Sequence, residues 1–583
     1  MQKNIHIFSL LFLSLWGAVY AQETNEIGTE TVTVVKPYSP TVSDAFKIKS
    51  APNLNDSIVL QKKNIDYSIF SVPVASTFTP AKGKASGVKK TPPPTLYNSY
   101  ASVGLGNYNN ALVDFYTSRE FNRGENLLDF GLTHLSSRGD IDSTPLDTDF
   151  YNTKLNVSYA KKDREMDWGA SVGLQHQLYN WYGIDSEAFD DTTIATMDER
   201  QNYFNAQAQA HIKLEDSFFK QGNILLRRFW DAVDSGENRV VINPTIELPI
   251  TEELVTIDAK LDYVNGSFEN ASLNNELNDA AINYGHFQAG VTPSLLILRD
   301  DLTLNLGASF VYGMDTENSD GNFYIYPAVT ASYRLLDETV IAYGGIEGQL
   351  KQNSYHDFVD ENPYVSPTLT IEPTDQQYEG YVGLKGQLSS NVGYNIKGSY
   401  MAENRKPLFF LNPQNLFRDD EKSYYYGNSF QVFYDDVKTL GVFGEINVDV
   451  NRNFTLGINA EFYDYDTETD NPAWNLPSIK GSLFMDYQID EQWYMGANLF
   501  YIGERDDLMA QVVQNAQPSE FPATMVTLDG YFDANAHLGY RFNEQLSVFV
   551  KASNIANNNY QRWANFRVQG FQALAGVSYK FDF

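Results

Sequence analysis

Residues 571–583 read FQALAGVSYKFDF, and their side chains alternate between apolar and polar character. The odd-numbered positions hold only apolar or aromatic residues, namely Phe571, Ala573, Ala575, Val577, Tyr579, Phe581 and Phe583. The even-numbered positions are polar or small, with Leu574 as the exception. Successive side chains of a β-strand point to opposite faces, so the segment predicts a strand with one apolar and one polar face. Such a strand, finishing on an aromatic residue, is typical of a barrel whose outer surface meets lipid.

This last strand resembles the C-terminal signal of bacterial outer-membrane barrels. The resemblance rests on four residues, Gly576, Tyr579, Phe581 and Phe583. It implies that they form the barrel-assembly signal, and that the protein is a multi-pass β-barrel of the Gram-negative outer membrane. The alternative is a soluble extracellular all-β adhesin, which would not need this ending.

The first 21 residues predict a secretory signal peptide. Lys3 precedes the apolar run 7–16, and Val19-Tyr20-Ala21 fits a small-residue cleavage site. We therefore expect the mature chain to begin at Gln22. The chain has no cysteine, which excludes a lipoprotein signal and disulfides. No later run of 18 apolar residues predicts a transmembrane helix.

The composition suits a membrane barrel. The chain contains 38 Tyr and 37 Phe, enough for aromatic girdles at two membrane interfaces. Its mean hydropathy of −0.37 looks like that of a soluble protein, but alternating polar residues lower the average of a barrel in the same way. The net charge of −32 disfavours nucleic acid as a partner, since phosphate contacts need clustered Lys and Arg. The expected partners are outer-membrane lipid and other outer-membrane or periplasmic proteins.

Two further regions follow the signal peptide. Residues 22–95 are rich in Pro and Lys and end near the run Pro92-Pro93-Pro94, so they predict an irregular periplasmic arm and linker. Residues 96–583 change to alternating segments of about ten to fifteen residues, enough for a tilted strand that crosses a membrane, and they predict the barrel domain.

Two kinds of connection join these segments. Short polar turns are expected at 122–125, 161–165, 216–222, 251–253, 299–301, 337–338, 389–391, 451–453, 490–492 and 543–545. Long loops are expected at 138–149, 183–200, 353–375, 404–436 and 504–523. This alternation is typical of outer-membrane barrels, with turns in the periplasm and loops outside. The ten turns join twenty strands and one more strand lies at each end, which predicts an all-β antiparallel barrel of about 22 strands.

That strand number and the segment 528–560 resemble the barrel of TonB-dependent receptors. Leu528-Asp529-Gly530-Tyr531 leads into a strand, and Asn554-Ile555 is followed by a turn and Tyr560. Near the N-terminus, Glu30-Thr31-Val32-Thr33-Val34-Val35 is similar to the TonB box of this family. The resemblance implies that these six residues form a partner strand, which would add to the edge of another sheet.

One departure from the family matters for function. TonB-dependent receptors carry a globular plug, whereas the proline-rich arm 22–95 is too short to form one. The whole pattern resembles a group of Bacteroidota proteins that are receptor-like but lack a plug. We therefore expect an accessory or structural subunit of an outer-membrane complex. A TonB-dependent-type transporter or channel for nutrient uptake remains the alternative. Without a plug, the lumen of the barrel would be filled by the arm, by inward-folded loops or by another protein, or it would be left open as a pore.

No catalytic motif or cofactor site is predicted. The seven histidines lack metal-ligand spacing, although a barrel enzyme assembled from distant strands stays possible. Asp464, Asp466, Glu468 and Asp470 form a weak calcium candidate in an expected loop, where simple solvation is the favoured interpretation. The aromatic stretches 408–413 and 424–426 are expected to pack in the lumen or to contact a partner.

Overall fold

The computed structural model describes residues 95–250, 253–269, 281–414, 423–511 and 522–583. The chain divides into two compact units, Met1–Leu96 and Tyr97–Phe583, and the second unit is the barrel. Within the described ranges, no helix combines the length and apolar character needed to cross a membrane.

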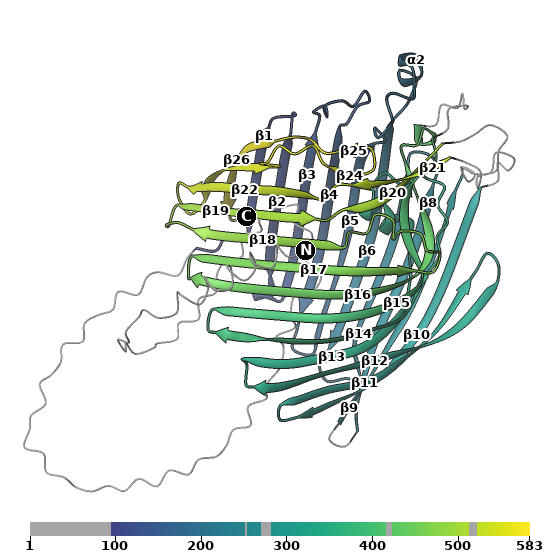
Figure 1. The fold of residues 1–583 in the computed structure, drawn as a ribbon. Coiled ribbons are helices and arrows are strands. Elements are labelled where there is room, and N and C mark those ends of the chain that lie inside the picture. The colour runs from purple at the N-terminus through teal and green to yellow at the C-terminus, as the bar shows by residue number, and fades with distance from the viewer. Residues whose placement is uncertain (1–94, 251–252, 270–280, 415–422, 512–521) are drawn as a thin grey trace, which may run out of the picture. The chain divides into compact units, whose positions relative to one another are not determined.

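Twenty-two strands form one antiparallel sheet that closes on itself (Figure 1). They are β1 (Ser99–Gly106), β2 (Ala111–Phe121), β3 (Asn126–Ser137), β4 (Phe150–Lys162), β5 (Met166–Asn180), β6 (Arg200–Leu214), β7 (Phe219–Asp231), β8 (Gly236–Ile250), β9 (Glu253–Phe268), β10 (Ile282–Arg299), β11 (Leu302–Asp315), β12 (Asp320–Leu336), β13 (Val340–Lys351), β14 (Thr374–Ser389), β15 (Val392–Leu411), β16 (Phe430–Asn451), β17 (Phe454–Thr467), β18 (Ile479–Gln488), β19 (Trp493–Ile502), β22 (Tyr531–Arg541), β23 (Leu546–Ser553) and β26 (Gln572–Phe581). The predicted fold class and strand number are confirmed.

The remaining elements lie in the connections. They are the helices α2 (Asp191–Ile194) and α3 (Tyr355–Glu361), the short 3-10 helices η2 (Asn122–Gly124) and η3 (Ser423–Tyr425), the hairpin β20 (Arg505–Ala510) with β21 (Ala523–Leu528), and the small hairpin β24 (Gln561–Trp563) with β25 (Phe566–Arg567).

The predicted connections fall at the ends of successive strands, with three corrections. The turn predicted at 216–222 ends earlier, because β7 begins at Phe219. The loop predicted at 404–436 is shorter, because β15 continues to Leu411 and β16 begins at Phe430. Leu408 and Val437 are buried against Trp474, so apolar packing extends this hairpin. The loop predicted at 504–523 contains β20 and the start of β21.

The closing strand β26 pairs with β23 on one side and with β1 on the other. Ala575, Val577 and Tyr579 are exposed on its outer face, as the alternation predicts. On the inner face Gly576 leaves room for the buried ring of Phe549. A Cβ at position 576 would come within 2.4 Å of this ring.

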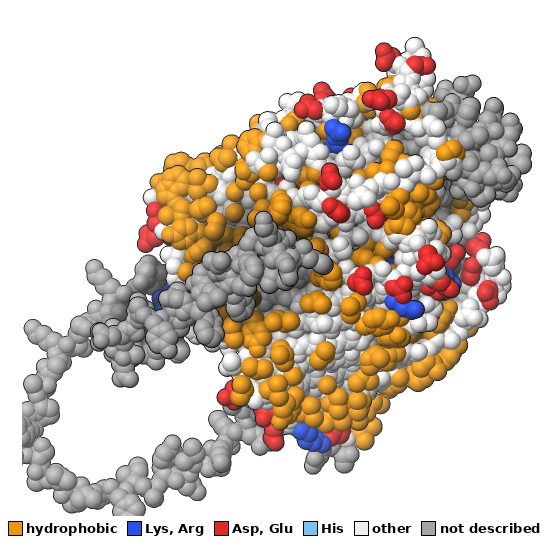
Figure 2. Space-filling view, in the orientation of Figure 1, with side chains coloured by type: hydrophobic (Ala, Val, Ile, Leu, Met, Phe, Trp, Pro, Cys, Tyr) orange, Lys and Arg blue, Asp and Glu red, His pale blue; other side chains and the backbone are white. Residues whose placement is uncertain are grey.

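Exposed apolar side chains cover the outer wall of the barrel (Figure 2). Examples from sixteen of the strands are Val103, Leu128, Val157, Val172, Leu226, Leu261, Val291, Ile325, Ile346, Val382, Ile396, Val442, Ile458, Leu499, Leu538 and Val577. Water would penalise so large an apolar surface, whereas hydrocarbon would not. The wall is therefore built to face lipid.

Candidate functional site

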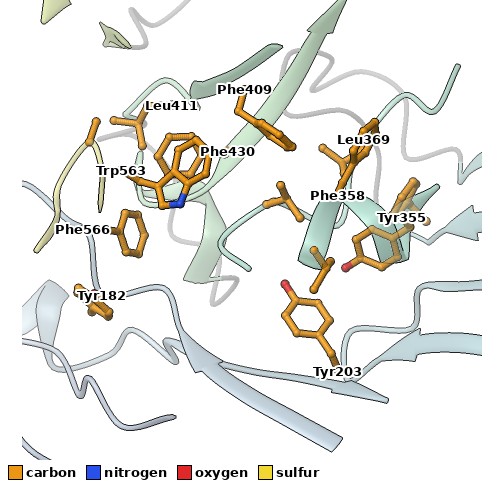
Figure 3. Packing of buried hydrophobic residues seen from close by; sticks show 14 of the residues in the cluster. Tyr182, Tyr203, Tyr355, Phe358, Leu369, Phe409, Leu411, Phe430, Trp563 and Phe566 are labelled. Carbon is orange, nitrogen blue, oxygen red and sulfur yellow. The ribbon is translucent and has the colours of Figure 1, made fainter. Parts of the chain in front are cut away.

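The long connections fold inward at one end of the barrel, which we call the loop end. Their buried apolar side chains join those of the strand ends in one cluster, which we call the loop layer (Figure 3). Its members are Ile141, Leu146, Tyr182, Ile184, Met197, Tyr203, Phe229, Val264, Phe268, Tyr284, Tyr355, Phe358, Val359, Val365, Leu369, Ile371, Phe409, Leu411, Tyr426, Phe430, Leu528, Trp563, Ala564 and Phe566. Segments far apart in the sequence therefore share one core inside the barrel.

Aromatic contacts connect one half of the loop layer. Tyr364, from the β13–β14 connection, stacks on Phe566 with 3.9 Å between ring centroids. Phe566 also contacts Tyr182, and Phe430 contacts Trp563 at 5.4 Å. Each such aromatic pair contributes about 0.5–1.5 kcal/mol beyond the area that it buries. These rings join the connections that follow β5, β13 and β23.

The other half of the loop layer is centred on α3. Ser354 is the N-cap of this helix, because its hydroxyl accepts a hydrogen bond from the backbone N–H of Asp357. Tyr355, Phe358 and Val359 are buried on the helix. The hydroxyl of Tyr203, on β6, donates to the carbonyl of Pro363 at 2.9 Å. Because Arg227 on β7 donates to the Ser354 hydroxyl at 2.9 Å, the connection is fixed to the barrel wall at both ends of α3.

Two arginines on the inner wall hold α3 through Asp357. Arg227 on β7 lies 3.3 Å from one carboxylate oxygen, and Arg239 on β8 lies 2.9 Å from the other. Arg239 also forms a bidentate ion pair with the fully buried Asp262, to which it donates two hydrogen bonds. Burial opposes ionisation of Asp357, but the hydrogen bond from His356 and the two guanidinium groups together hold the pKa of this carboxyl well below its usual range. Asp357 is therefore charged at physiological pH.

A second buried carboxylate completes this network. Glu237 on β8 lies 3.5 Å from the Arg227 guanidinium. It also accepts hydrogen bonds from the Tyr284 hydroxyl at 2.9 Å and from the Tyr355 backbone N–H at 2.6 Å. The side chains of Arg227 and Glu237 are only 7% and 1% exposed, so the ion pair is screened little by solvent.

The hairpin of β20 and β21 lies beside this region. Asp507 on β20 is fully buried, and it accepts hydrogen bonds from the backbone N–H of Leu411 and from the side chain of Asn475. Burial raises the pKa of Asp507 to about 6, although these hydrogen bonds oppose the shift. Folding therefore disfavours the charged form of this carboxyl relative to the unfolded chain.

The structure describes some of the site residues predicted from the sequence and not others. Glu30 to Val35, like the whole arm 22–94, lie outside the described residues. Tyr579 and Phe583 are exposed, and Phe581 contacts both of their rings. The aromatic stretches 408–413 and 424–426 pack inside, where Tyr424, Tyr425 and Tyr426 are buried, which agrees with the first of the two expectations, packing in the lumen.

The calcium candidate was placed in the wrong kind of element. Asp464 and Asp466 lie on β17 rather than in a loop, and both are exposed on the face that also carries Phe462. Tyr463 and Tyr465 alternate with them, which is the pattern of a strand. Only Glu468 and Asp470 follow the strand. Across the described ranges, no group of three or more His, Cys, Asp or Glu could hold a metal ion.

The residues of the α3 network were missed from the sequence. Arg227, Arg239 and Asp262 occupy inward positions of their strands, and a charge there signals a partner in the lumen. The sequence gives no sign that this partner is Asp357, which lies 130 positions after Arg227.

The closed 22-stranded wall with its apolar outer face defines a transmembrane β-barrel of the outer membrane, built like the barrel of outer-membrane receptors. No protein-family model matches the chain, and no curated protein matches it. Solved structures do show the fold. The FrpB iron transporter from Neisseria meningitidis is 10% identical, with a TM-score of 0.63, and the match covers 84% of this chain and 82% of that one.

Two receptors give similar matches. The siderophore receptor PirA from Acinetobacter baumannii is 12% identical with a TM-score of 0.61, over 83% of this chain and 80% of PirA. The pyoverdine outer-membrane receptor FpvA from Pseudomonas aeruginosa is 12% identical with a TM-score of 0.60, over 84% and 79%. At this identity the likeness concerns the fold alone, and it agrees with the receptor-type barrel that the sequence predicted.

Proposed function

We propose that this outer-membrane barrel acts as an accessory or structural subunit of a larger outer-membrane complex, and that it is not an enzyme. The observation that supports this best is the loop layer. The chain's own connections place buried rings and a buried ion-pair network inside the loop end of the barrel. A solute crossing the barrel would have to pass or displace them.

Displacing the α3 connection is costly. It would break both ion pairs of Asp357 and would expose Phe358 and Val359 to water, which costs about 1.5–3 kcal/mol for each of these apolar side chains. Since each 1.4 kcal/mol is a tenfold change in population, the displaced state would hold less than about 1% of the molecules. The loop layer is thus suited to a fixed structural role rather than to frequent opening.

In this proposal the periplasmic arm 22–95 makes the contact with the complex. Glu30 to Val35 form the partner strand, and backbone pairing with another sheet edge supplies the affinity. The proline-rich arm is too short to form a plug, so the barrel would have no plug for TonB to displace.

The test is a pull-down in gentle detergent, with partners identified by mass spectrometry. The double substitution Val32→Pro and Val34→Pro should reduce recovery of the partner and leave barrel assembly unchanged, because proline removes strand hydrogen bonds. Ser86→Pro, elsewhere in the arm, is the matched control. Unchanged partner recovery in the double variant would contradict the role of this strand.

The second candidate is a TonB-dependent-type transporter or channel. Two observations favour it: the named functions of the structural neighbours, an iron transporter and siderophore receptors, and the likeness of Glu30 to Val35 to a TonB box. It predicts that the same double-proline variant loses energy-dependent uptake of a nutrient. A transport defect that depends on the proton-motive force would therefore replace the first proposal with this one.

A further inference from the structure

One arginine interrupts the apolar outer wall near the loop end. On β7 the side chains of Ile224 and Leu226 face outward, and they are 44% and 48% exposed. Arg227 and Phe229 alternate with them and are buried inside the barrel. Arg228 shares the outward face with Ile224 and Leu226, and it is exposed.

The level of Arg228 along the wall can be read from its neighbours. A row of outward-facing rings crosses β4 to β7 just beyond it, toward the loop end. His176 stacks on Phe204 at 4.4 Å, and Phe204 stacks on Trp230 at 5.4 Å. Aromatic side chains collect at the boundary between hydrocarbon and headgroups. Since Trp230 is the next outward residue after Arg228, the guanidinium lies at this boundary.

The local structure leaves the guanidinium available. Its one hydrogen bond among the described residues goes to Asn238, directly opposite on β8, at 3.3 Å. Asn265 on β9 pairs in register with Asn238 and adds a second amide to the same outer face. Gly236 lies under the guanidinium, where a Cβ would come within 2.5 Å of an Arg228 nitrogen. The site therefore presents one cation and two amides, with room above a glycine.

Two other basic residues on the outer face have acidic neighbours. Lys220, at the opposite end of β7, pairs with Glu247 at 3.9 Å. Lys438 on β16 is exposed and lies directly opposite Asp466 of β17. Among the described residues Arg228 makes no ion pair, although a guanidinium carries five donors in a geometry that matches phosphate oxygens.

We propose that Arg228, with Asn238 and Asn265, binds the phosphate of an anionic lipid headgroup in the leaflet at the loop end. This is the outer leaflet in the predicted orientation. The aromatic row sets the depth, Gly236 allows the guanidinium to lie along the wall, and Trp230 packs beside the lipid. A charge-assisted hydrogen bond to phosphate also accounts for a cation on a lipid-facing strand, because such a charge is tolerated near the interface but not at the bilayer centre.

The test compares purified full-length protein with Arg228→Ala, using native mass spectrometry in detergent. Phosphatidylglycerol is the anionic probe, phosphatidylcholine the zwitterionic one and inorganic phosphate the soluble one. We expect the apparent affinity for phosphatidylglycerol to fall about tenfold in Arg228→Ala, the usual effect of losing a charged hydrogen bond. Gly236→Ala should give a smaller loss, because it displaces the guanidinium without removing it.

The matched control is Lys438→Ala, which removes an outward cation that already faces an acid. It should bind phosphatidylglycerol like the wild type, and all variants should remain folded barrels. The proposal is overturned if Arg228→Ala binds phosphatidylglycerol normally, or if Lys438→Ala loses as much affinity. Equal competition by inorganic phosphate would overturn it as well, since the site would then recognise a free anion and not a lipid.

Discussion

The barrel wall and the loop layer are held together by different interactions. In the wall, each strand is bonded to its neighbours through its backbone, and β26 pairs along most of its length with both β1 and β23. In the loop layer, the decisive bonds join side chains from distant segments, such as Arg227 with Asp357 and Phe430 with Trp563. The wall should therefore tolerate many side-chain changes, whereas the loop layer depends on a few residues.

The largest expected effect comes from breaking the wall. Deleting 579–583 removes the end of β26, including Tyr579, and leaves unpaired backbone groups of β1 and β23 in lipid. Unsatisfied backbone groups cost several kcal/mol each in hydrocarbon, so the truncated chain should fail to assemble. The measurement is the fraction of protein recovered as a folded barrel in the outer membrane, with Lys580→Gln as the control. Normal insertion of the truncated chain would contradict the role of the closing strand.

A smaller effect should come from breaking the loop layer alone. Arg227→Ala leaves Glu237 buried without its ionic partner and weakens the hold on α3, which should destabilise the layer by about 3–5 kcal/mol. The wall should remain intact. Channel conductance in planar bilayers should rise, and protease should cut within 352–373. Arg228→Ala, the outward neighbour, is the control, and a similar conductance from both variants would refute the difference between the two regions.

The hairpin of β20 and β21 should respond to pH. Because burial raises the pKa of Asp507 from 3.8 to about 6, its stabilising contribution is fully present below about pH 4 and is lost as the pH rises through 6. The loss corresponds to about 3 kcal/mol. Thermal unfolding from pH 4 to 7 measures it. Asp507→Asn stays neutral, so it should be more stable than the wild type above pH 6, and parallel pH profiles of the two proteins would count against this assignment.

The least disruptive test determines which end of the barrel faces the outside of the cell. An epitope inserted near Asp419, in a long connection, should be labelled on intact cells. An epitope at Arg452, in the turn between β16 and β17, should be labelled only after the outer membrane is permeabilised. The opposite labelling pattern would reverse the predicted orientation of the barrel.

The wall could be predicted from the sequence because its signals are local. Side-chain alternation marks each strand, and several turn residues adopt positive φ angles that Asn and Asp tolerate well, for example Asn122 at 50° and Asp337 at 47°. The error at Asp464 and Asp466 came from reading acidic residues as a loop, although the alternating Tyr463 and Tyr465 carried the strand signal.

The loop layer could not be predicted in the same way. Tyr203 bonds to Pro363 across 160 positions, and Tyr182 bonds to Arg567 across 385 positions. No local pattern encodes such pairings, because they follow from the curvature of the closed wall. The sequence indicated that the aromatic stretches pack in the lumen or contact a partner, but it did not indicate which residues contact them.

The register between β1 and β26 also has a consequence for biogenesis. The backbone N–H of Asn98 donates to the side chain of Asp582 across 484 positions, so the two strand edges that close the barrel are separated by nearly the whole domain. During synthesis and transport the edge of β1 therefore stays unpaired with β26 until the last strand has been made and delivered. Contacts of such high contact order form slowly, and a waiting strand edge is prone to pair with the wrong chain. The rate at which the nascent chain is shielded from such mispairing, rather than the stability of the finished barrel, should limit how much of this protein a cell can make.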